Sequence, residues 1–194
     1  MSHKLKLNRL FLLFIFFTNL VSAAQNFPDQ FYMEYELTQS SNFVGTMTIK
    51  YESKNKNYSF KAVTKGQGIL RLLGNRELYS KGVIDNKGFY PKKFELKNIK
   101  KPKKNITAIF QHTSKKIKIK YKGETSFIDL KPKALDLGIY LYQFNFEKKN
   151  KDKYSFNVLE GKKVREYEYN KIRDEIIVVN NKDKATELYE GRII

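Results

Sequence analysis

The stretch Lys116-Ile117-Lys118-Ile119-Lys120-Tyr121 decides the fold class of this chain. Apolar side chains alternate with lysines, so one side of the stretch is apolar and the other is charged. This period of two is typical of a β-strand with one face buried and one face in water. The same alternation occurs in residues 31–38 and 106–111. The chain is therefore predicted to consist mainly of strands.

Turn-forming residues separate the alternating stretches. They occur as Lys54-Asn55-Lys56-Asn57, Asp85-Asn86-Lys87-Gly88, Lys122-Gly123, Glu160-Gly161 and Asn180-Asn181. Their spacing of roughly 8 to 15 residues is typical of a meander of antiparallel strands. The predicted strands span residues 31–39, 43–53, 57–65, 76–85, 89–98, 105–112, 115–121, 124–130, 153–159, 162–170, 174–180 and 184–190. The lysine-rich residues 97–104, which include Pro102, are predicted to form a solvated hairpin tip.

One segment departs from the alternation. After Pro132, apolar residues recur at near-helical spacing, at Ala134, Leu135, Ile139, Tyr142 and Phe146. This spacing predicts one short helix near residues 134–146. A long open sheet would leave its edges exposed. The predicted fold is therefore mainly β, an antiparallel meander that forms a strongly curved sheet or a barrel-like fold with this one helix.

The first residues have the order of an export signal. Lys4, Lys6 and Arg9 precede an apolar run from Leu10 to Phe17 that reaches to about Val21, and the small residues Ser22, Ala23 and Ala24 stand where a signal peptidase would cut. The run is shorter than the roughly 20 apolar residues that a membrane-spanning helix needs, so no permanent membrane anchor is expected. Residues 1–24 are predicted to be a cleavable signal peptide, and residues 25–194 a single β-rich periplasmic domain, soluble after cleavage.

Composition restricts the chemistry and the partners. The chain has no cysteine, which excludes disulfides, thiol nucleophiles and thiolate metal sites. Its net charge is +18, of which Lys4, Lys6 and Arg9 contribute three, and this excess favours an anionic lipid, a lipoprotein or an acidic envelope polymer as partner. The competing interpretation is the lysine and asparagine usage of an AT-rich genome. No nucleic acid is expected, because export separates the protein from it and arginine is scarce.

Few residues are candidates for catalysis. After the predicted signal the chain has one histidine, His112, for which a structural role at a strand end is favoured. The carboxylate pairs Glu34 and Glu36, and Glu166 and Glu168, have the spacing of one strand face. Such pairs can serve glycoside hydrolysis, although cross-strand charge pairing is the favoured interpretation. No catalytic residue, cofactor or metal ion is predicted, and enzymatic activity is left open.

The stretch from Gly66 to Gly74 contains the candidate ligand-binding residues. It has glycines at both ends of an apolar run and lacks the ending of a phosphate-binding loop. The apolar residues form either a corner of the core, which is favoured, or the lip of a ligand cavity. These residues are Ile69, Leu70, Leu72 and Leu73.

The order of several short motifs resembles a family of exported, β-rich bacterial proteins known as a domain of unknown function. The matching pieces are Val44-Gly45-Thr46-Met47, Tyr58-Ser59-Phe60, Gly66-Gln67-Gly68, Ser80-Lys81-Gly82, Gly88-Phe89-Tyr90-Pro91-Lys92-Lys93-Phe94, Leu135-Asp136-Leu137-Gly138-Ile139-Tyr140 and Glu160-Gly161-Lys162-Lys163-Val164. The resemblance covers most of residues 31–180 and implies an antiparallel, barrel-like fold and an envelope location. It implies no established activity and no catalytic residues.

Three functions remain open. The leading hypothesis is non-enzymatic binding of an apolar or amphiphilic envelope molecule, such as a lipid or the acyl chain of a lipoprotein. The alternatives are an envelope hydrolase that uses His112 or a carboxylate pair, and an assembly factor that docks on an acidic cell-surface polymer through its lysines.

Overall fold

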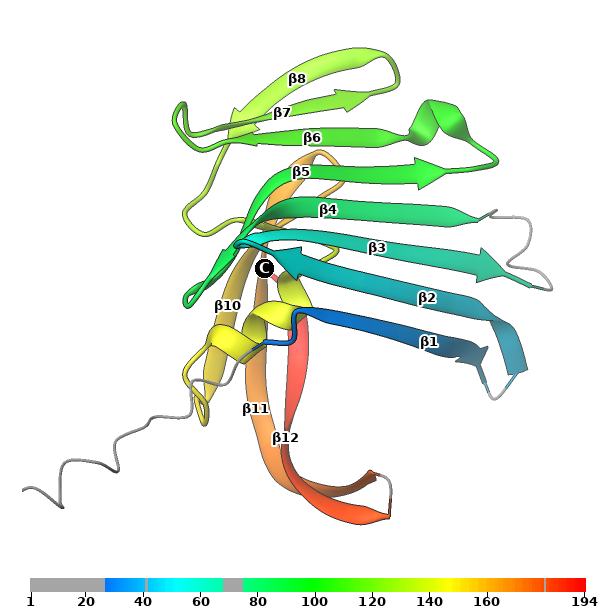
Figure 1. The fold of residues 1–194 in the computed structure, drawn as a ribbon, viewed down its shortest axis with the longest axis vertical. Coiled ribbons are helices and arrows are strands. Elements are labelled where there is room, and N and C mark those ends of the chain that lie inside the picture. Colours follow the sequence, from blue (N-terminus) through cyan, green and yellow to red (C-terminus); the bar gives the residue numbers. More distant parts are fainter. Residues whose placement is uncertain (1–26, 41, 68–74, 180) are drawn as a thin grey trace, which may run out of the picture.

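Eight consecutive strands form one antiparallel sheet in which every strand is hydrogen-bonded to the next along the chain (Figure 1). They are β1 (Gln30–Gln39), β2 (Asn42–Lys54), β3 (Asn57–Gly66), β4 (Arg76–Asp85), β5 (Gly88–Asn98), β6 (Ile106–Gln111), β7 (Lys116–Tyr121) and β8 (Glu124–Asp129). The structure is a computed structural model and describes residues 27–40, 42–67, 75–179 and 181–194. The predicted signal peptide and the candidate residues Ile69, Leu70, Leu72 and Leu73 lie outside these ranges.

Alternation of side chains determines which face of each strand is buried. Ile117 and Ile119 on β7 are fully buried, whereas the three lysines between and beside them are exposed. In the sheet, Ile117 pairs with Phe110 and Ile119 pairs with Ala108, both of which are buried on β6. Apolar side chains of neighbouring strands therefore gather on one face, as the alternation in the sequence predicts.

A second sheet contains four strands in the order β12-β11-β10-β9. Its strands are β9 (Leu135–Asp136), β10 (Lys153–Glu160), β11 (Lys163–Val179) and β12 (Lys182–Ile193). β9 pairs with β10 in parallel, and the other pairs are antiparallel. The prediction of separate strands at 162–170 and 174–180 was wrong. The pairing of β11 with β12 shifts its register between Lys171 and Arg173, where β11 forms a bulge. β11 therefore continues as one long strand past the position of the predicted break.

The predicted helix at 134–146 is confirmed only in its second half. Residues 135–136 form β9, and a 3-10 helix, η4, spans Tyr140–Phe146. The Asp136 side chain accepts a hydrogen bond of 2.9 Å from the backbone N–H of Gly138. A side chain that binds backbone N–H groups in this way competes with the hydrogen bonds of an α-helix, so the helix begins after this turn. A second 3-10 turn, η3 (Pro102–Lys104), lies in the predicted hairpin tip between β5 and β6.

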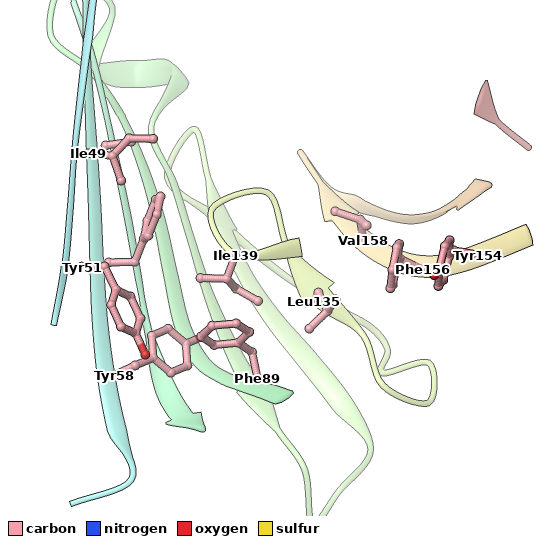
Figure 2. Close-up of a cluster of buried hydrophobic side chains, with 11 residues drawn as sticks. Ile49, Tyr51, Tyr58, Phe89, Leu135, Ile139, Tyr154, Phe156 and Val158 are labelled. Carbon is pink, nitrogen blue, oxygen red and sulfur yellow. The ribbon is translucent and has the colours of Figure 1, made fainter. Parts of the chain in front are cut away.

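The segment that contains β9 and η4 lies between the two sheets and fills their interface. Figure 2 shows Leu135 and Ile139 with side chains of the large sheet on one side and side chains of β10 on the other. Aromatic rings continue this core, because Phe27 makes edge-on contacts with Tyr51 at 5.2 Å and Phe89 at 5.3 Å between ring centroids. A second cluster of buried residues lies beside it: Phe94, Ile106, Ala108, Phe110, Ile117, Ile119, Ala134 and Leu159.

Gln143 attaches η4 to the turn between β4 and β5. Its amide oxygen accepts a hydrogen bond of 3.0 Å from Phe89 N–H, and its amide nitrogen donates one of 3.0 Å to the Lys87 carbonyl. Gly88, with a φ of 113°, lies under the amide, and a Cβ there would be 2.1 Å from the Gln143 oxygen. The turn therefore requires glycine for its backbone conformation and for the close approach of Gln143.

The fold is mainly β and antiparallel, as predicted, but the described strands form no closed barrel. β1 and β8 are the two ends of the large sheet and do not pair with each other. The apolar face of the large sheet is instead covered by η4 and by the small sheet, whose strands run across those of the large sheet in Figure 1. Covering by a second layer buries the core without closing the sheet.

Candidate functional site

A hollow opens at the end of the large sheet where the segment after β8 passes the β4–β5 turn. Its volume is about 420 Å³. The lining residues are Phe89, Tyr90, His112, Lys115, Leu130, Lys131, Pro132, Lys133 and Ala134. Leu130 is half-buried and Pro132 is exposed, so part of the surface is apolar, whereas Phe89 and Ala134 are buried and contribute little of it. The volume lies within the range of small-molecule sites, which is roughly 300 to 1,000 Å³.

A smaller hollow of about 180 Å³ adjoins the first. The two share Phe89, Tyr90, Pro132 and Lys133 in their linings. The smaller one extends towards β10, where Leu135 and Phe156 add apolar surface, and towards Gln143 on η4. We call these two adjoining hollows together the lysine-rimmed hollow.

The rim of the lysine-rimmed hollow is positively charged. Lys87, Lys115, Lys131 and Lys133 line it and are exposed, and no Asp or Glu lines the larger part. Glu147 lines the smaller part, where its carboxylate binds Lys151 at 3.0 Å. Among the described residues, no carboxylate forms an ion pair with the ammonium groups on the rim. Cations of one sign around a concave surface concentrate anions there.

His112 lies on the wall of the hollow and is bound to the main chain. Its Nε2 donates a hydrogen bond of 2.7 Å to the carbonyl oxygen of Pro91 on β5. A carbonyl oxygen can only accept, so Nε2 carries a proton in this contact. The bond fixes the imidazole to the neighbouring strand, which is a structural contact at the end of β6.

A separate polar cluster is sealed inside the core. Ser80 on β4 donates a hydrogen bond of 2.6 Å to the Asp136 carboxylate, and Tyr58 on β3 lies 3.0 Å from the Ser80 hydroxyl. Burial raises the pKa of Asp136 to about 7, while the Ser80 and backbone hydrogen bonds act in the opposite direction. Ser80 and Asp136 are 2% and 0% exposed. A substrate has no access to these groups, so they join the two sheets and do not form an active site.

The carboxylate pairs do not form a cleft. Glu168 is buried and binds Lys153 and Arg192, with the Arg192 contact at 2.6 Å. These partners, Lys153 first, lower the pKa of Glu168 to about 2. Glu166 accepts a hydrogen bond of 2.5 Å from Ser155 on the adjacent strand. Glu34 and Glu36 are exposed on β1 and pair in register with Thr48 and Thr46.

Apart from His112, the residues that line the hollow are not among the candidates that the sequence singled out. The candidates Ile69, Leu70, Leu72 and Leu73 lie outside the described residues. The sequence feature that could have indicated the hollow is the group Lys131-Pro132-Lys133, which follows the last strand of the large sheet. Only the β7–β8 pairing places Lys115 beside it, through the hydrogen bond of 2.9 Å from Leu130 N–H to the Lys115 carbonyl.

The described residues form neither a cluster of metal ligands nor a helix that could span a membrane. Within the part of the chain that the structure describes, no three His, Asp or Glu side chains cluster as metal ligands would. No helix in the same part has both the length and the apolar composition needed to cross a membrane.

Comparisons with known proteins give a family. No curated protein and no solved structure matches the chain. A family model described as a protein of unknown function, DUF3108, matches residues 34–189. This range includes every strand from β2 to β11, most of β1 and part of β12, and therefore both sheets and the lysine-rimmed hollow. The chain belongs to the DUF3108 family of proteins of unknown function.

Proposed function

We propose that this protein is exported to a bacterial periplasm and there binds an anionic amphiphile, such as a phospholipid or the acylated end of a lipoprotein, in the lysine-rimmed hollow. Export is supported by the order of charged, apolar and small residues in positions 1–24. Binding is supported by the combination of apolar surface and a cationic rim in the same hollow.

The proposal rests on one observation: the hollow has apolar surface inside and cationic side chains around it. Leu130 and Pro132 offer apolar contact, and each buried methylene of a ligand contributes about 0.8 kcal/mol. Lys131 and Lys133 frame this surface and can bind an anionic head group while their ammonium groups stay in water. A ligand with an anionic head and a short apolar segment satisfies both requirements.

A hydrolase is less well supported by the same residues. His112, the only histidine after the predicted signal, is bonded to the Pro91 carbonyl, and neither carboxylate pair lines the hollow. A general base needs a proton of the substrate or of a water within hydrogen-bonding reach, together with a group that orients it. The described residues do not assemble such a set around His112.

The binding proposal is tested with the mature chain and a short-chain phospholipid, dihexanoyl phosphatidylglycerol, by isothermal titration calorimetry. The double variant Lys131→Glu/Lys133→Glu is expected to bind at least about tenfold more weakly, which is a loss of about 1.4 kcal/mol. The control is Lys118→Glu/Lys120→Glu, which makes the same change of charge on the exposed face of β7. We expect the control to lose less than about threefold in affinity, because long-range attraction is screened in physiological salt.

Two comparisons separate the possible outcomes. Dihexanoyl phosphatidylcholine tests the need for net negative charge, and glycerophosphoglycerol, the head group without acyl chains, tests the need for apolar contact. Equal binding of head group and lipid would overturn the amphiphile proposal and favour docking on an acidic polymer. Equal losses in the two double variants would show that the hollow has no special role.

Export is tested independently. Protein recovered from its native host is expected to begin at Ala24 or Gln25, as measured by N-terminal sequencing. A mature pool that retains Met1 would contradict export by cleavage.

A further inference from the structure

The end of the small sheet is a two-stranded ribbon. β10 pairs with β11 only as far as Asn170, and from Arg173 to Val179 β11 pairs with β12 alone. In Figure 1 the ribbon curves away from the two packed sheets. Along residues 172–179 the side of β11 opposite β12 therefore has no neighbouring strand among the described residues. Its backbone N–H and C=O groups on that side form an open strand edge.

This open edge is apolar on both faces. Ile176 and Val178 are 70% and 69% exposed, and Ile177 and Val179 are each 42% exposed. Successive residues of a strand point to opposite faces, so each face presents two β-branched side chains. On β12, Ile176 pairs with Ala185, and the partners of the other three, from Lys184 to Lys182, are polar. The apolar surface is therefore concentrated along the free strand and does not spread over the whole ribbon.

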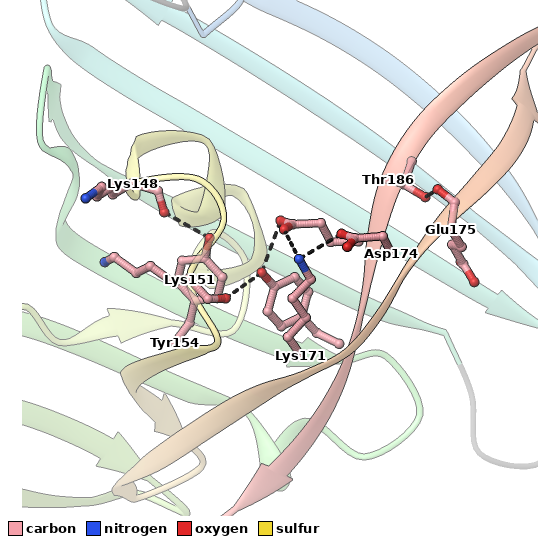
Figure 3. Close-up of polar contacts among 9 residues, drawn as sticks. Lys148, Lys151, Tyr154, Lys171, Asp174, Glu175 and Thr186 are labelled. Carbon is pink, nitrogen blue, oxygen red and sulfur yellow. Dashed lines mark hydrogen bonds and ion pairs between the residues drawn. The ribbon is translucent and has the colours of Figure 1, made fainter.

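The base of the ribbon is held by a polar network, which Figure 3 shows. The Lys171 ammonium binds the carboxylates of Glu187 and Asp174, both at 2.7 Å. Tyr189 donates a hydrogen bond of 2.7 Å to the Lys151 carbonyl and so attaches β12 to the segment that precedes β10. These contacts fix the direction in which the ribbon leaves the sheet, so its open edge is presented in a defined orientation.

We propose that residues 172–179 of β11 form a dimerisation edge that pairs antiparallel with the same residues of a second copy of this chain. Pairing satisfies the open backbone groups and buries the four apolar side chains on both faces at once. A two-fold axis perpendicular to the sheet keeps residues of the same face opposite each other. With the axis at Ile177, Ile176 faces Val178 of the second copy, and with the axis at Val178, Ile177 faces Val179.

The charge of the ribbon favours a second copy as its partner. The chain has a net charge of +18, but residues 171–187 contain four basic and four acidic residues and are neutral. Two copies can therefore approach through the ribbon, whereas like charge opposes approach through the rest of the surface. The ends of the apolar run are also charged on both sides, by Arg173 and Asp174 before it and Lys182 and Asp183 after it, which limits its length.

Insertion of the ribbon into a membrane fits the same residues less well. Hydrocarbon offers no hydrogen-bond partner to an open strand edge, and open edges do not occur exposed to lipid in that region. Because residues 171–187 are neutral, an anionic membrane surface would also give the ribbon no net attraction. A second strand fits better because it supplies the missing backbone partners and leaves the charged residues in water.

The dimerisation edge is tested by cysteine cross-linking, which is simple because the natural chain has no cysteine. Directly opposed residues of an antiparallel pair have Cα atoms about 4.5 to 5.5 Å apart, within the range of a disulfide. The mature chain with Ile177→Cys or Val178→Cys is oxidised in air at several concentrations. At least one variant is expected to give a disulfide-linked dimer, and the one that does identifies the position of the axis.

Phe127→Cys is the control, because Phe127 is an exposed apolar residue on β8, the edge strand of the large sheet. We expect it to cross-link at least about tenfold more slowly. Sedimentation velocity gives a second measurement: the natural sequence is expected to dimerise as its concentration rises, and Val178→Lys is expected to stay monomeric with an unchanged thermal melt. Cross-linking at the same rate at all three positions, or a natural chain that is monomeric at about 1 mM, would overturn the proposal.

Discussion

Ser80 on β4 donates a hydrogen bond of 2.6 Å to Asp136 on β9, and this bond connects the large sheet to the small one inside the core. The two residues are 56 positions apart in the chain. Tyr58 extends the connection to β3 through the Ser80 hydroxyl. Burial favours the protonated form of the Asp136 carboxyl group, because no cation offsets its charge, and the hydrogen bonds from Ser80 and the backbone oppose this effect only in part.

This environment predicts that stability falls as pH rises. The pKa of Asp136 is raised from 3.8 to about 7 by burial, so between these values the folded protein binds more protons than the unfolded chain. The contribution of Asp136 is therefore largest in acid and is lost as pH rises towards 7, by roughly 3 kcal/mol between pH 5 and pH 8. Asp136→Asn removes this titration and keeps hydrogen-bonding groups at the site.

Urea unfolding at pH 5 and pH 8 measures the effect. We expect Asp136→Asn to lose less stability than the natural chain over this interval, and to be the more stable of the two at pH 8. Asp129→Asn is the control, because Asp129 is exposed and its pKa is lowered by a hydrogen bond from Lys116. Identical pH profiles for the natural chain and Asp136→Asn would contradict the prediction.

A side chain at Gly138 is predicted to destabilise the protein. A Cβ at this position would lie 2.6 Å from Leu78 and 3.1 Å from both Asp136 and Phe60. Gly138→Ala is therefore expected to cost about 1 to 3 kcal/mol in unfolding free energy, as overpacked core sites do. The double variant with Leu78→Ala tests the cause, since removing the leucine methyl groups relieves the closest contact. Strictly additive losses in the double variant would show that this contact is not the source.

Glu168 is predicted to stabilise the protein above about pH 4.5 and to lose this effect in acid. Its pKa is lowered from 4.5 to about 2 by Lys153, Asn170 and Arg192, so the folded protein holds it as a carboxylate. The contribution is present above the unfolded value and disappears as pH falls through the folded value. Glu168→Gln is expected to reduce the melting temperature at pH 6, and the difference from the natural chain should shrink between pH 4.5 and pH 2. A difference independent of pH would exclude the ion pairs as its origin.

Binding of the amphiphile is predicted to depend on salt. If the head group lies between Lys131 and Lys133, raising the salt concentration screens the attraction and weakens binding, because the Debye length falls from about 30 Å at 0.01 M to about 8 Å at physiological ionic strength. Titrations of dihexanoyl phosphatidylglycerol at the two salt concentrations measure this. The salt dependence is expected to be smaller in Lys131→Glu/Lys133→Glu. Affinity that does not change with salt would remove the lysines from the site.

Local patterns were sufficient for most of the strands. The alternation around Ile117 and Ile119 depends only on neighbours two residues apart, and the strand β7 that it predicts is present with its lysines exposed. Turn residues such as those around Gly88 separate the strands where the structure has its turns. The sequence also indicated that Glu166 and Glu168 pair with side chains of adjacent strands, because their spacing places both on one strand face.

Where the sequence patterns predicted the wrong element, a contact with a residue remote in the sequence is the cause. The spacing of Leu135 and Ile139 is that of a helix, but the Asp136 side chain binds Ser80 from a distant strand and the nearby Gly138 N–H, and the chain becomes extended there. Near Ile172 a bulge in the pairing with β12 keeps β11 continuous where the sequence indicated a break. Both outcomes depend on a partner that is remote in the sequence.

The sequence by itself determined that the chain is mainly β and where most of its strands begin and end, because alternation and turn residues act over a few positions. The tertiary structure alone decided that the large sheet stays open, that β9 and η4 fill the space between two sheets, and that Lys115 meets Lys131 and Lys133 around one hollow. These features depend on strand register and on the burial of one layer against another, which are properties of residues that meet only after the chain has folded.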